Sequence, residues 1–335
     1  MSSVADPVLV AGASGFAGAL AARIIDRHPH FELAAITSRS DVGVALGDLY
    51  PHHRVRRTLE ELDLDRHGDV AAAIVAYPHG ASAPVVAELL ARGVKVVDLS
   101  ADFRLRDVAV YEEYYVEHPH PELIEQAVYG LPELHREAIK DTSLVAGPGC
   151  YPTAAILALA PLARAGLIDD VVIDAKSGVS GAGRAATAKT HFVTVDENVN
   201  AYGVGTHRHA PEIDQALRLA GAAGVTCTFT PHLVPLDQGE LVSCYVTTSA
   251  DDPGDVVALL EEAYGDEPFV DVVTRPPGVR DVRETNICAV HVTIDARTNK
   301  IIVFGAIDNL WKGTSSQAVQ SLNLMFGRPE TEGIA

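Results

Sequence analysis

Length, composition and charge describe an ordinary globular protein and exclude several classes of function. The chain has 335 residues, enough for about two domains, of which 47% are hydrophobic and 21% charged. Lysine and arginine total 26 against 45 aspartates and glutamates, and the resulting net charge of −19 opposes binding to nucleic acid and to anionic membranes. An anionic substrate therefore needs a local basic pocket.

The sequence gives no sign of a membrane-bound or secreted protein. No apolar run approaches the roughly 20 residues of a membrane span, and residues 1–7 lack the basic and apolar regions of a signal peptide. The cysteines lie far apart without CxxC pairing, which predicts neither a zinc site nor a disulfide framework; they are Cys150, Cys227, Cys244 and Cys288. We therefore expect a cytoplasmic protein with reduced thiols.

The N-terminal residues predict a strand, a glycine-rich loop and a helix. Residues 8–11 form an apolar run, the small-residue loop 12–18 follows, and 19–27 have a helical pattern. Small residues let the backbone approach a pyrophosphate, and the N–H groups at a helix N-terminus face it. The spacing is GxxGxxG and not the strict GxGxxG. We expect a dinucleotide cofactor to contact Gly12, Ser14, Gly15 and Phe16.

The next expected strand, 31–37, ends in residues that favour NADP over NAD. An NAD-binding unit places an acidic residue here for the ribose hydroxyl, whereas this chain has Ser38 and Arg39. A hydroxyl and a guanidinium suit a 2′-phosphate. The alternative is a solvated turn in which the arginine is incidental.

Strands and helices continue to alternate as far as residue 146, which predicts a doubly wound parallel sheet. Apolar strands are expected at 71–76, 94–99 and 143–146, with a helix at 83–92. Such a sheet binds its ligands at the carboxyl ends of the strands.

Two residues near those strand ends are candidate ligand contacts. Pro78, in the loop after the strand at 71–76, is a candidate cofactor contact. Arg104 follows the strand at 94–99 and is a candidate anion contact. A structural salt bridge between Arg104 and Asp102 or Asp107 is the alternative interpretation.

The stretch 147–153, Gly-Pro-Gly-Cys-Tyr-Pro-Thr, places a cysteine before a run, 154–160, that is typical of a buried helix. At a helix N-terminus, unpaired N–H groups and the helix dipole favour a thiolate, which is a nucleophile near neutral pH. The same N–H groups suit the oxyanion formed when sulfur attacks an acyl carbon. Cys150 is thus a candidate nucleophile, and the alternative is a small core residue.

Beyond Cys150 the pattern changes to strands that outnumber helices, which predicts a second domain with a mixed, largely antiparallel sheet. The expected strands are 171–177, 226–230, 239–247, 286–294 and 300–306. A final helix at 315–326 is expected to return to the first domain. We therefore expect an α/β protein with a Rossmann-type doubly wound sheet and an α+β catalytic domain.

Two polar segments of this second part are candidate ligand contacts. The glycine-rich loop 177–184 suits close passage over a ligand, although an ordinary flexible loop is equally consistent with it. In 202–213, two histidines flank an arginine just before a helix that begins with proline, which suits an acid/base group and an anion contact. No third ligand is spaced to form a metal site with these histidines. The candidate substrate contacts are Arg104, Arg184, Lys189, His207 and Arg208.

The chain resembles the N-acetyl-γ-glutamyl-phosphate reductases, NADP-dependent enzymes of arginine biosynthesis related to aspartate-semialdehyde dehydrogenase. The segments that carry the resemblance run nearly from end to end; they are 12–18, 98–104, 129–134, 147–153, 207–213 and 308–313. The resemblance implies an NADP-binding Rossmann domain at 1–149, completed by the C-terminal helix at 312–335, and a catalytic domain at 150–311. It also implies a homodimer or homotetramer.

For the site, the resemblance implies reduction of an acyl phosphate by NADPH through a thioester on Cys150, with His209 as the catalytic histidine. It places Asn309 near the nicotinamide amide, and Ser180 and Gly181 against the cofactor. Gly147, Gln238 and residues 314–316 depart from the family pattern. Alternatives that stay open are the same chemistry on an N-acetyl-aminoadipyl or aspartyl phosphate, and a non-catalytic NADP-binding redox sensor in which Cys150 is oxidised.

Overall fold

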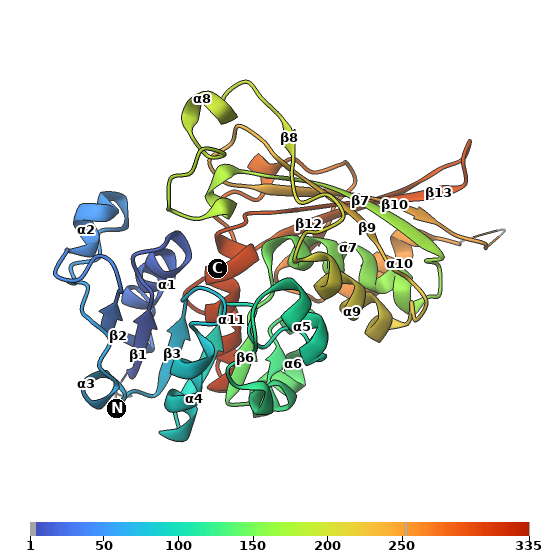
Figure 1. The fold of residues 1–335 in the computed structure, drawn as a ribbon. Helices are drawn as coiled ribbons and strands as arrows, with labels where there is room; N and C mark the ends of the chain where they lie inside the picture. The colour runs from blue at the N-terminus through green and yellow to red at the C-terminus, as the bar shows by residue number, and fades with distance from the viewer. Residues whose placement is uncertain (1–4, 251, 253, 335) are drawn as a thin grey trace. The chain divides into compact units, whose positions relative to one another are not determined.

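The computed structural model describes residues 5–250, 252 and 254–334, and the chain divides into two compact units (Figure 1). Unit 1 consists of Met1–Pro148 and Thr314–Ala335, and unit 2 is Gly149–Gly313. The chain therefore leaves unit 1 once and returns to it at the end. In the parts that the structure describes, no helix has the length and apolar character needed to cross a membrane.

Unit 1 is built on a six-stranded parallel sheet in the order β2-β1-β3-β4-β6-β5. Its strands are β1 (Asp6–Ala11), β2 (Phe31–Thr37), β3 (Ala72–Val75), β4 (Lys95–Asp98), β5 (Val128–Tyr129) and β6 (Leu144–Ala146). From β1 the chain continues to β2 on one side, and the later strands, from β3 onward, lie on the other side. The connections that follow β1 and β3 therefore leave the carboxyl ends of these strands in opposite directions. This is the doubly wound sheet that the sequence predicts, and its switch point is where such sheets bind ligands.

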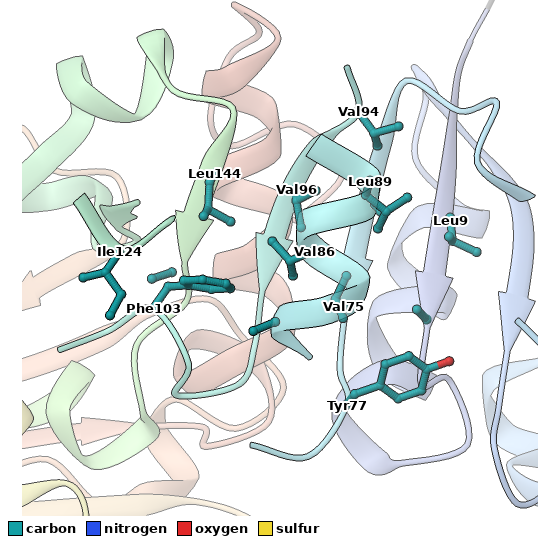
Figure 2. Close-up of a cluster of buried hydrophobic side chains, with 14 of the residues drawn as sticks. Leu9, Val75, Tyr77, Val86, Leu89, Val94, Val96, Phe103, Ile124 and Leu144 are labelled. Carbon is teal, nitrogen blue, oxygen red and sulfur yellow. The ribbon is translucent and has the colours of Figure 1, made fainter. Parts of the chain in front are cut away.

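The helices of unit 1 lie along both faces of the sheet. They are α1 (Phe16–Asp26), α2 (Leu46–Leu49), α3 (Leu64–His67), α4 (Ala83–Ala91), α5 (Val108–Tyr114), α6 (Pro132–Asp141) and α11 (Ser316–Met325). α4 packs on β3 and β4, whereas α1 contacts α11, which in turn contacts α6. Leu9 and Ala11 of β1 join the apolar cluster under α4 (Figure 2). Because side chains alternate along a strand, Val8 and Val10 face the other side.

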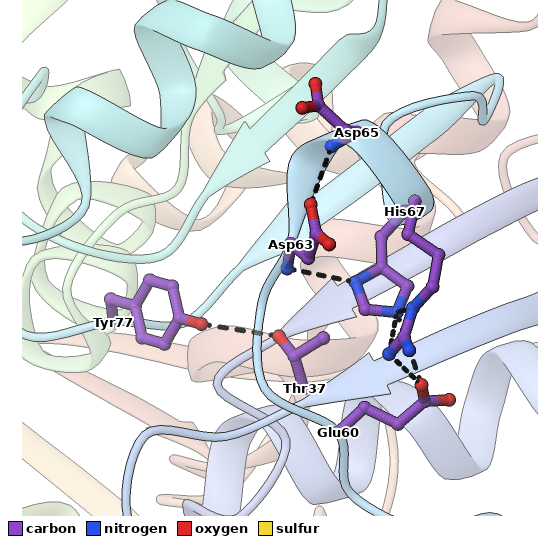
Figure 3. Close-up of polar contacts among 7 residues, drawn as sticks. Thr37, Glu60, Asp63, Asp65, His67 and Tyr77 are labelled. Carbon is purple, nitrogen blue, oxygen red and sulfur yellow. Dashed lines mark hydrogen bonds and ion pairs between the residues drawn. The ribbon is translucent and has the colours of Figure 1, made fainter.

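The segment after β2 is held beside that strand at its carboxyl end. The N–H of Ser38 donates to Glu60 O (2.9 Å), and the N–H of Glu60 donates to Ile36 O (3.0 Å). Glu60 also pairs with Arg66, and the N–H of Asp63 donates to His67 Nδ1 (3.2 Å), as Figure 3 shows. These contacts fix the backbone at the end of β2.

Unit 2 contains a seven-stranded sheet in the order β11-β12-β13-β10-β7-β9-β8. The strands are β7 (Asp170–Ser177), β8 (Asn200–Ala201), β9 (Thr228–Leu233), β10 (Glu240–Thr247), β11 (Val270–Val272), β12 (Cys288–Asp295) and β13 (Lys300–Ile307). The pairs β7/β9 and β11/β12 are parallel and the other pairs are antiparallel. The predicted mixed, largely antiparallel sheet is confirmed.

The long helix of unit 2, α7 (Cys150–Arg164), packs on β10, β12 and β13. α9 (Ala210–Ala220) packs against α7, while α8 (Phe192–Val195) and α10 (Val256–Tyr264) complete the helices of this unit. Along each strand under α7, every second side chain points toward the helix and the others point to the opposite face of the sheet. Val242 and Cys244 of β10 are fully buried, whereas Tyr245 is 36% exposed beside Val172 of β7 at 37%.

Short helical turns connect these elements. Short 3₁₀ helices occur at Pro51–His53, Pro121–Gln126, Val179–Ala182 and Val279–Asp281, and a π turn at Trp311–Ser315 precedes α11. The Ser315 hydroxyl donates to Ala17 O (2.8 Å), which ties the start of α11 to α1 within unit 1. Ser315 belongs to the segment 314–316 that departs from the family pattern, and the hydroxyl has a structural partner here.

Candidate active site

The loop between β1 and α1 forms a cradle that only small residues permit. Gly12 has φ of +90°, and a Cβ there would lie 2.6 Å from Ala76 O. A Cβ on Gly18 would overlap Gly12 O, so loop and helix touch through their backbones. Gly15 caps α1 without a side-chain bond, which leaves the first N–H groups, those of Phe16 and Ala17, without an acceptor inside the helix. This cradle fits a pyrophosphate.

Two predicted cofactor contacts, Ser14 and Ser38, meet beside this loop. Their hydroxyl oxygens are 2.9 Å apart, and Ser38 Oγ also accepts the N–H of Asp41 (3.1 Å). Burial raises the pKa of Tyr77. The exposed guanidinium of Arg39 is near enough for its charge to lower that pKa in part. Tyr77 shares a hydrogen bond with Thr37 (3.3 Å; Figure 3). Serine hydroxyls and a solvated guanidinium thus lie at the end of β2.

The remaining predicted contacts of unit 1 differ in exposure. Pro78 is exposed just after β3. Arg104 is buried, and its guanidinium donates to the backbone oxygens of Gly147 (2.7 Å) and Leu99 (2.9 Å). These two bonds explain why a cation is tolerated inside the unit, and they join the loop after β4 to the chain that follows β6. A Cβ on Gly147 would lie 3.1 Å from Asp98 O, a tight contact that glycine avoids.

Cys150 is the first residue of α7, and its side chain is half-buried. The first turn closes where the N–H of Thr153 donates to Gly149 O (2.9 Å). The N–H groups that precede Thr153 in this turn have no carbonyl partner in the helix, so they favour an anion at the sulfur or an oxyanion beside it. By contrast, Cys227 and Cys244 are buried, and burial raises the pKa of both thiols. The nucleophile predicted from sequence therefore occupies a position suited to attack.

The imidazole of His209 lies against the residue that precedes the nucleophile. A Cβ on Gly149 would be 2.6 Å from His209 Nε2, so the ring occupies space that only glycine leaves open. His209 caps the start of α9, and Glu212 in the first turn of that helix accepts the N–H of Gly149 through Oε1 (2.9 Å). The start of α9 therefore contacts the start of α7 in two ways: the His209 ring packs against Gly149, and Glu212 accepts the Gly149 N–H.

His207 is packed differently from His209. Its ring centroid lies 5.8 Å from that of Tyr151, 5.4 Å from Tyr202 and 5.2 Å from Phe229. Burial, with a smaller contribution from the charge of Arg208, lowers the pKa of His207 to about 4. Its Nδ1 accepts the N–H of His209 (3.1 Å). His207 is therefore neutral near pH 7 and offers an anion a hydrogen bond but no charge.

Asn309 connects two of the predicted cofactor-side segments. Its Oδ1 accepts the N–H of Gly239 (2.7 Å), and its Nδ2 donates to Ser180 Oγ (3.0 Å). Ser180 is buried, whereas Gly181 is exposed. Asn309 thus fixes the 3₁₀ turn at Val179–Ala182 to the residue before β10.

The other predicted basic contacts of unit 2 are solvent-exposed. Arg184 and Lys189 lie in the exposed segment that follows the 3₁₀ turn, and Arg208 points its charge close enough to affect His207. Exposed cations are available to an anionic ligand at little desolvation cost. Their roles as substrate contacts stay predictions.

Sequence reasoning assigned no role to three residues that the structure places at this site. Glu212 and Tyr151 lie inside the segments singled out for His209 and Cys150, and both are buried. Tyr151 receives a hydrogen bond from Tyr202 (3.1 Å between hydroxyl oxygens). Glu240, at the start of β10, is fully buried. The sequence signal that would have identified Glu240 is an acidic residue at the start of an apolar strand, which was not used in predicting the site.

Family models match both parts of the chain. Residues 7–142 match the model described as "Semialdehyde dehydrogenase, NAD binding domain", and residues 150–309 match "Semialdehyde dehydrogenase, dimerisation domain". The first range contains the glycine cradle with Ser38 and Arg39, and the second begins at Cys150.

Solved structures share the fold. Aspartate semialdehyde dehydrogenase II from Vibrio cholerae, complexed with ASA, matches with a TM-score of 0.74 at 18% identity, over 97% of this chain and 99% of that chain. Aspartate semialdehyde dehydrogenase from Candida albicans, with NADP, matches with a TM-score of 0.68 at 14% identity, over 96% and 99% of the two chains. These matches confirm the predicted fold class.

Sequence relatives are far more similar. Proteins named N-acetyl-gamma-glutamyl-phosphate reductase are 52% identical in Desulforudis audaxviator, over 97% of this chain and 96% of the relative, and 47% identical in Moorella thermoacetica, over 96% of each. A third, from Desulfotalea psychrophila, is 46% identical over 98% of this chain and 97% of the relative. The chain therefore belongs to the N-acetyl-γ-glutamyl-phosphate reductase family of the semialdehyde dehydrogenases.

Proposed function

We propose that this protein reduces N-acetyl-γ-glutamyl phosphate to N-acetylglutamate semialdehyde, with NADPH as reductant and release of phosphate. The observation that carries the proposal is the placement of His209 against Gly149, beside Cys150 at the start of α7. Nucleophilic catalysis needs a thiol, an oxyanion site and an acid/base group within one small volume. Family membership supplies the substrate class.

In the covalent step, the sulfur of Cys150 attacks the acyl carbon and the C–O bond to phosphate breaks, which leaves a thioester. The N–H groups of the first turn of α7 suit the oxyanion that forms on the carbonyl oxygen. A thioester keeps the carbonyl electrophilic while removing the charged phosphate. When the C–S bond later breaks, the aldehyde leaves and the thiol is restored.

His209 is the proposed acid/base group of these steps. Its ring lies at Gly149, and the backbone beneath it is fixed because Glu212 binds the Gly149 N–H. A positioned imidazole can give a proton to the departing phosphate or to the oxygen of the reduced thioester. Such groups contribute about 10²- to 10⁴-fold to turnover.

Residues of unit 1 fit an NADP cofactor. The backbone of Gly12, Gly15 and Phe16 suits the pyrophosphate, and Ser14, Ser38 and Arg39 suit the ribose and its 2′-phosphate. Pro78, Ser180, Gly181 and Asn309 are the further proposed contacts. When bound, the cofactor supplies the hydride that reduces the acyl group held on Cys150.

The substrate carries a phosphate and a carboxylate in an otherwise acidic protein. We assign their binding to Arg184, Lys189 and Arg208, which are exposed cations, with a neutral hydrogen bond from His207. Arg104 has carbonyl partners in unit 1 and remains a less direct candidate. The domain limits 1–149 with 312–335, and 150–311, are proposed as the cofactor and catalytic domains.

The match to a dimerisation domain supports assembly into a homo-oligomer. We propose that the sheet face turned away from α7 takes part, because it exposes Tyr245 and Val172 as directly opposed neighbours on β10 and β7. Dimer and tetramer are both consistent with this face. Cytoplasmic location stays a prediction from the sequence.

The reverse reaction provides the test. Purified protein is mixed with N-acetylglutamate semialdehyde, NADP and phosphate, and NADPH formation is followed spectrophotometrically. We expect turnover that requires phosphate and that C150S loses by orders of magnitude, because an alcohol lacks an accessible anion. Aspartate semialdehyde and N-acetyl-aminoadipate semialdehyde serve as comparison substrates. Equal or faster turnover of either would contradict the proposed substrate.

A further inference from the structure

Glu240 is a buried carboxyl group at the first position of β10, and the mechanism above does not use it. Its side chain is fully buried in the middle of the sheet, where it pairs in register with Ser177 of β7 on one side and Ile307 of β13 on the other. A charged residue at such a position is rare unless it is paired or functional.

The packing of α7 places Glu240 beside the start of that helix. Farther along, Val242 and Ala154 both approach Gly305 of β13. Val242 is on the same strand face as Glu240, because side chains alternate. Ala154 lies about one helical turn after Cys150. Glu240 lies two residues before Val242 on β10, and Cys150 lies about one turn before Ala154 on α7. The same packing of helix on strand therefore places Glu240 beside Cys150.

The neighbouring strand gives the same placement independently. Ile307 is the register partner of Glu240. A Cβ on Gly313 would lie 3.2 Å from Cδ1 of Ile307 and 2.9 Å from the Cβ of Cys150. Ile307 and Cys150 therefore both lie against Gly313.

The electrostatics of Glu240 follow from this burial. Removal from water raises the pKa of its carboxyl to about 8, and the Cys150 thiol and Ser177 hydroxyl offset only part of the effect. Among the residues that the structure describes, neither carboxyl oxygen has a hydrogen-bond partner of good geometry. A buried carboxyl without such partners retains its proton at neutral pH.

Within the described part of the chain, no cation contributes to the electrostatics of Glu240 that would hold it ionised. The titratable groups that interact with it are Cys150 and Tyr151 from α7, Tyr202 from the loop after β8, and Asp308 at the end of β13. Asp308 repels a charge on Glu240. The pKa of each tyrosine is raised, chiefly by burial, so both phenols are neutral.

We propose that Glu240 is the acid–base partner of Cys150, so that the two groups share one proton. The proposal rests on the covalent step of the proposed function. In the resting pair the shared proton lies on a carboxyl oxygen of Glu240 and the sulfur is a thiolate, so the C–S bond forms without an S–H bond having to break. The carboxyl keeps that proton through the thioester, and when the C–S bond of the reduced intermediate breaks, the sulfur leaves as a thiolate beside the protonated carboxyl, which restores the pair. A neutral carboxyl also adds no negative charge beside the thiolate, as an ionised one would.

His209 keeps a separate task in this scheme. It serves the phosphate and the carbonyl oxygen, while Glu240 serves the sulfur. The division follows from position, because His209 lies over the backbone of Gly149 and Glu240 lies under α7 in the sheet.

Alkylation of Cys150 by iodoacetamide, measured from pH 5 to pH 10 without substrate, tests the shared proton directly. The other three cysteines are buried, and C150S gives the background rate. Two groups that share a proton titrate in two coupled steps. We therefore expect a broad rise of rate with pH for the native protein and a single-ionisation curve for E240Q. Coincident curves would overturn the proposal.

Two further variants separate this role from a structural one. E240D keeps an ionisable group and should retain the broad curve even if E240Q folds poorly. D98N removes another fully buried carboxyl, in unit 1, and should leave the alkylation curve of Cys150 unchanged. A curve altered by D98N as much as by E240Q would also overturn the proposal, because the effect would then not be specific to position 240.

Steady-state kinetics complete the test. E240Q should lower kcat by about 10²-fold with KM changed less than about threefold, and E240D should recover at least about tenfold of the loss. A native kcat in E240Q contradicts the proposal. Alkylation needs no substrate, so a protein with coupled alkylation but no turnover of N-acetylglutamate semialdehyde would refute the proposed function and leave the Cys150–Glu240 pair standing.

Discussion

The imidazole of His209 and the α-carbon of Gly149 are in direct contact, and no other side chain at position 149 leaves room for the ring. Gly149 has φ of −68° and ψ of 154°, which any residue adopts without strain. G149A should therefore fold normally and displace only the ring. We expect kcat to fall about 10²-fold, since a 1 Å misplacement of a catalytic group has about that effect.

The measurement for G149A combines steady-state kinetics with the thermal midpoint. G166A is the control, a replacement at a glycine with open space around it, although its positive φ costs some stability. An unchanged kcat in G149A, with native stability, would show that the position of His209 is not critical.

The two histidines should differ in their pH behaviour. Burial lowers the pKa of His207 to about 4, so this ring is neutral throughout the range from pH 5.5 to 9 and contributes no ionisation there. H209N should lower kcat by about 10²- to 10⁴-fold and remove one limb of the kcat–pH profile. H207N should keep both limbs and mainly raise KM.

Kinetics of both histidine variants across pH decide between them. If H207N removes the limb and H209N keeps it, the assignment is reversed. A limb that survives in both variants would place the titrating group elsewhere.

Cofactor preference should depend on Arg39. Because its guanidinium is exposed at the end of β2 beside Ser38, we expect R39A to reduce the preference for NADP over NAD by about 1 to 3 kcal/mol. R92A is the matched control, since Arg92 lies after α4 and pairs with Asp65 and Glu88. Ratios of kcat/KM for the two cofactors measure the effect, and a native protein that favours NAD would refute the prediction at once.

Stability should vary with pH through Glu240. Its pKa is about 8 in the folded protein against an ordinary value of 4.5, so the folded state binds more protons than the unfolded state between these limits. The free energy of unfolding then decreases as pH rises from about 4.5 to 8, by about 4 kcal/mol from this group. E240Q should lose that slope and exceed the native protein in stability at pH 8.

Chemical denaturation at several pH values checks this difference. The comparison of native protein with E240Q cancels the other titrating groups, whose contributions are common to both. Parallel stability curves would mean that Glu240 is ionised with an ordinary pKa in the folded protein.

The parallel sheet of unit 1 was the part most readily predicted from sequence. Its strands are buried on both faces and appear as continuous apolar runs between turn residues, so the expected strand 31–37 coincides with β2. The helix expected at 154–160 is longer, because α7 runs from Cys150 to Arg164. Pro152 is compatible with the earlier start because it lies in the first turn, where no N–H bond is lost.

Short elements were missed for a physical reason. β5, β8 and β11 have two or three residues each, too few for any periodic pattern. α1 begins at Phe16, three residues before the expected start, because its first turn consists of the small residues that were assigned to the loop.

The site could be predicted only where one short segment carried its chemistry. Cys150 was found from its local sequence, since a helix start is a local feature. The bond between Glu212 and Gly149 joins residues 63 apart, and the approach of Glu240 to Cys150 depends on strand order. Neither follows from spacing along the chain.

The division of the chain also dictates an order of folding during synthesis. Unit 1 needs α11, whose residues are buried throughout, and beyond it Arg328 pairs with Asp6 and Glu330 with Arg136, both in the N-terminal segment of unit 1. Unit 2 is continuous, so it is complete in sequence as soon as Gly313 has left the ribosome. The first 148 residues must wait with an uncovered apolar face until the last segment emerges, and a ribosome that stalls after Gly313 leaves an aggregation-prone chain attached to a finished unit 2.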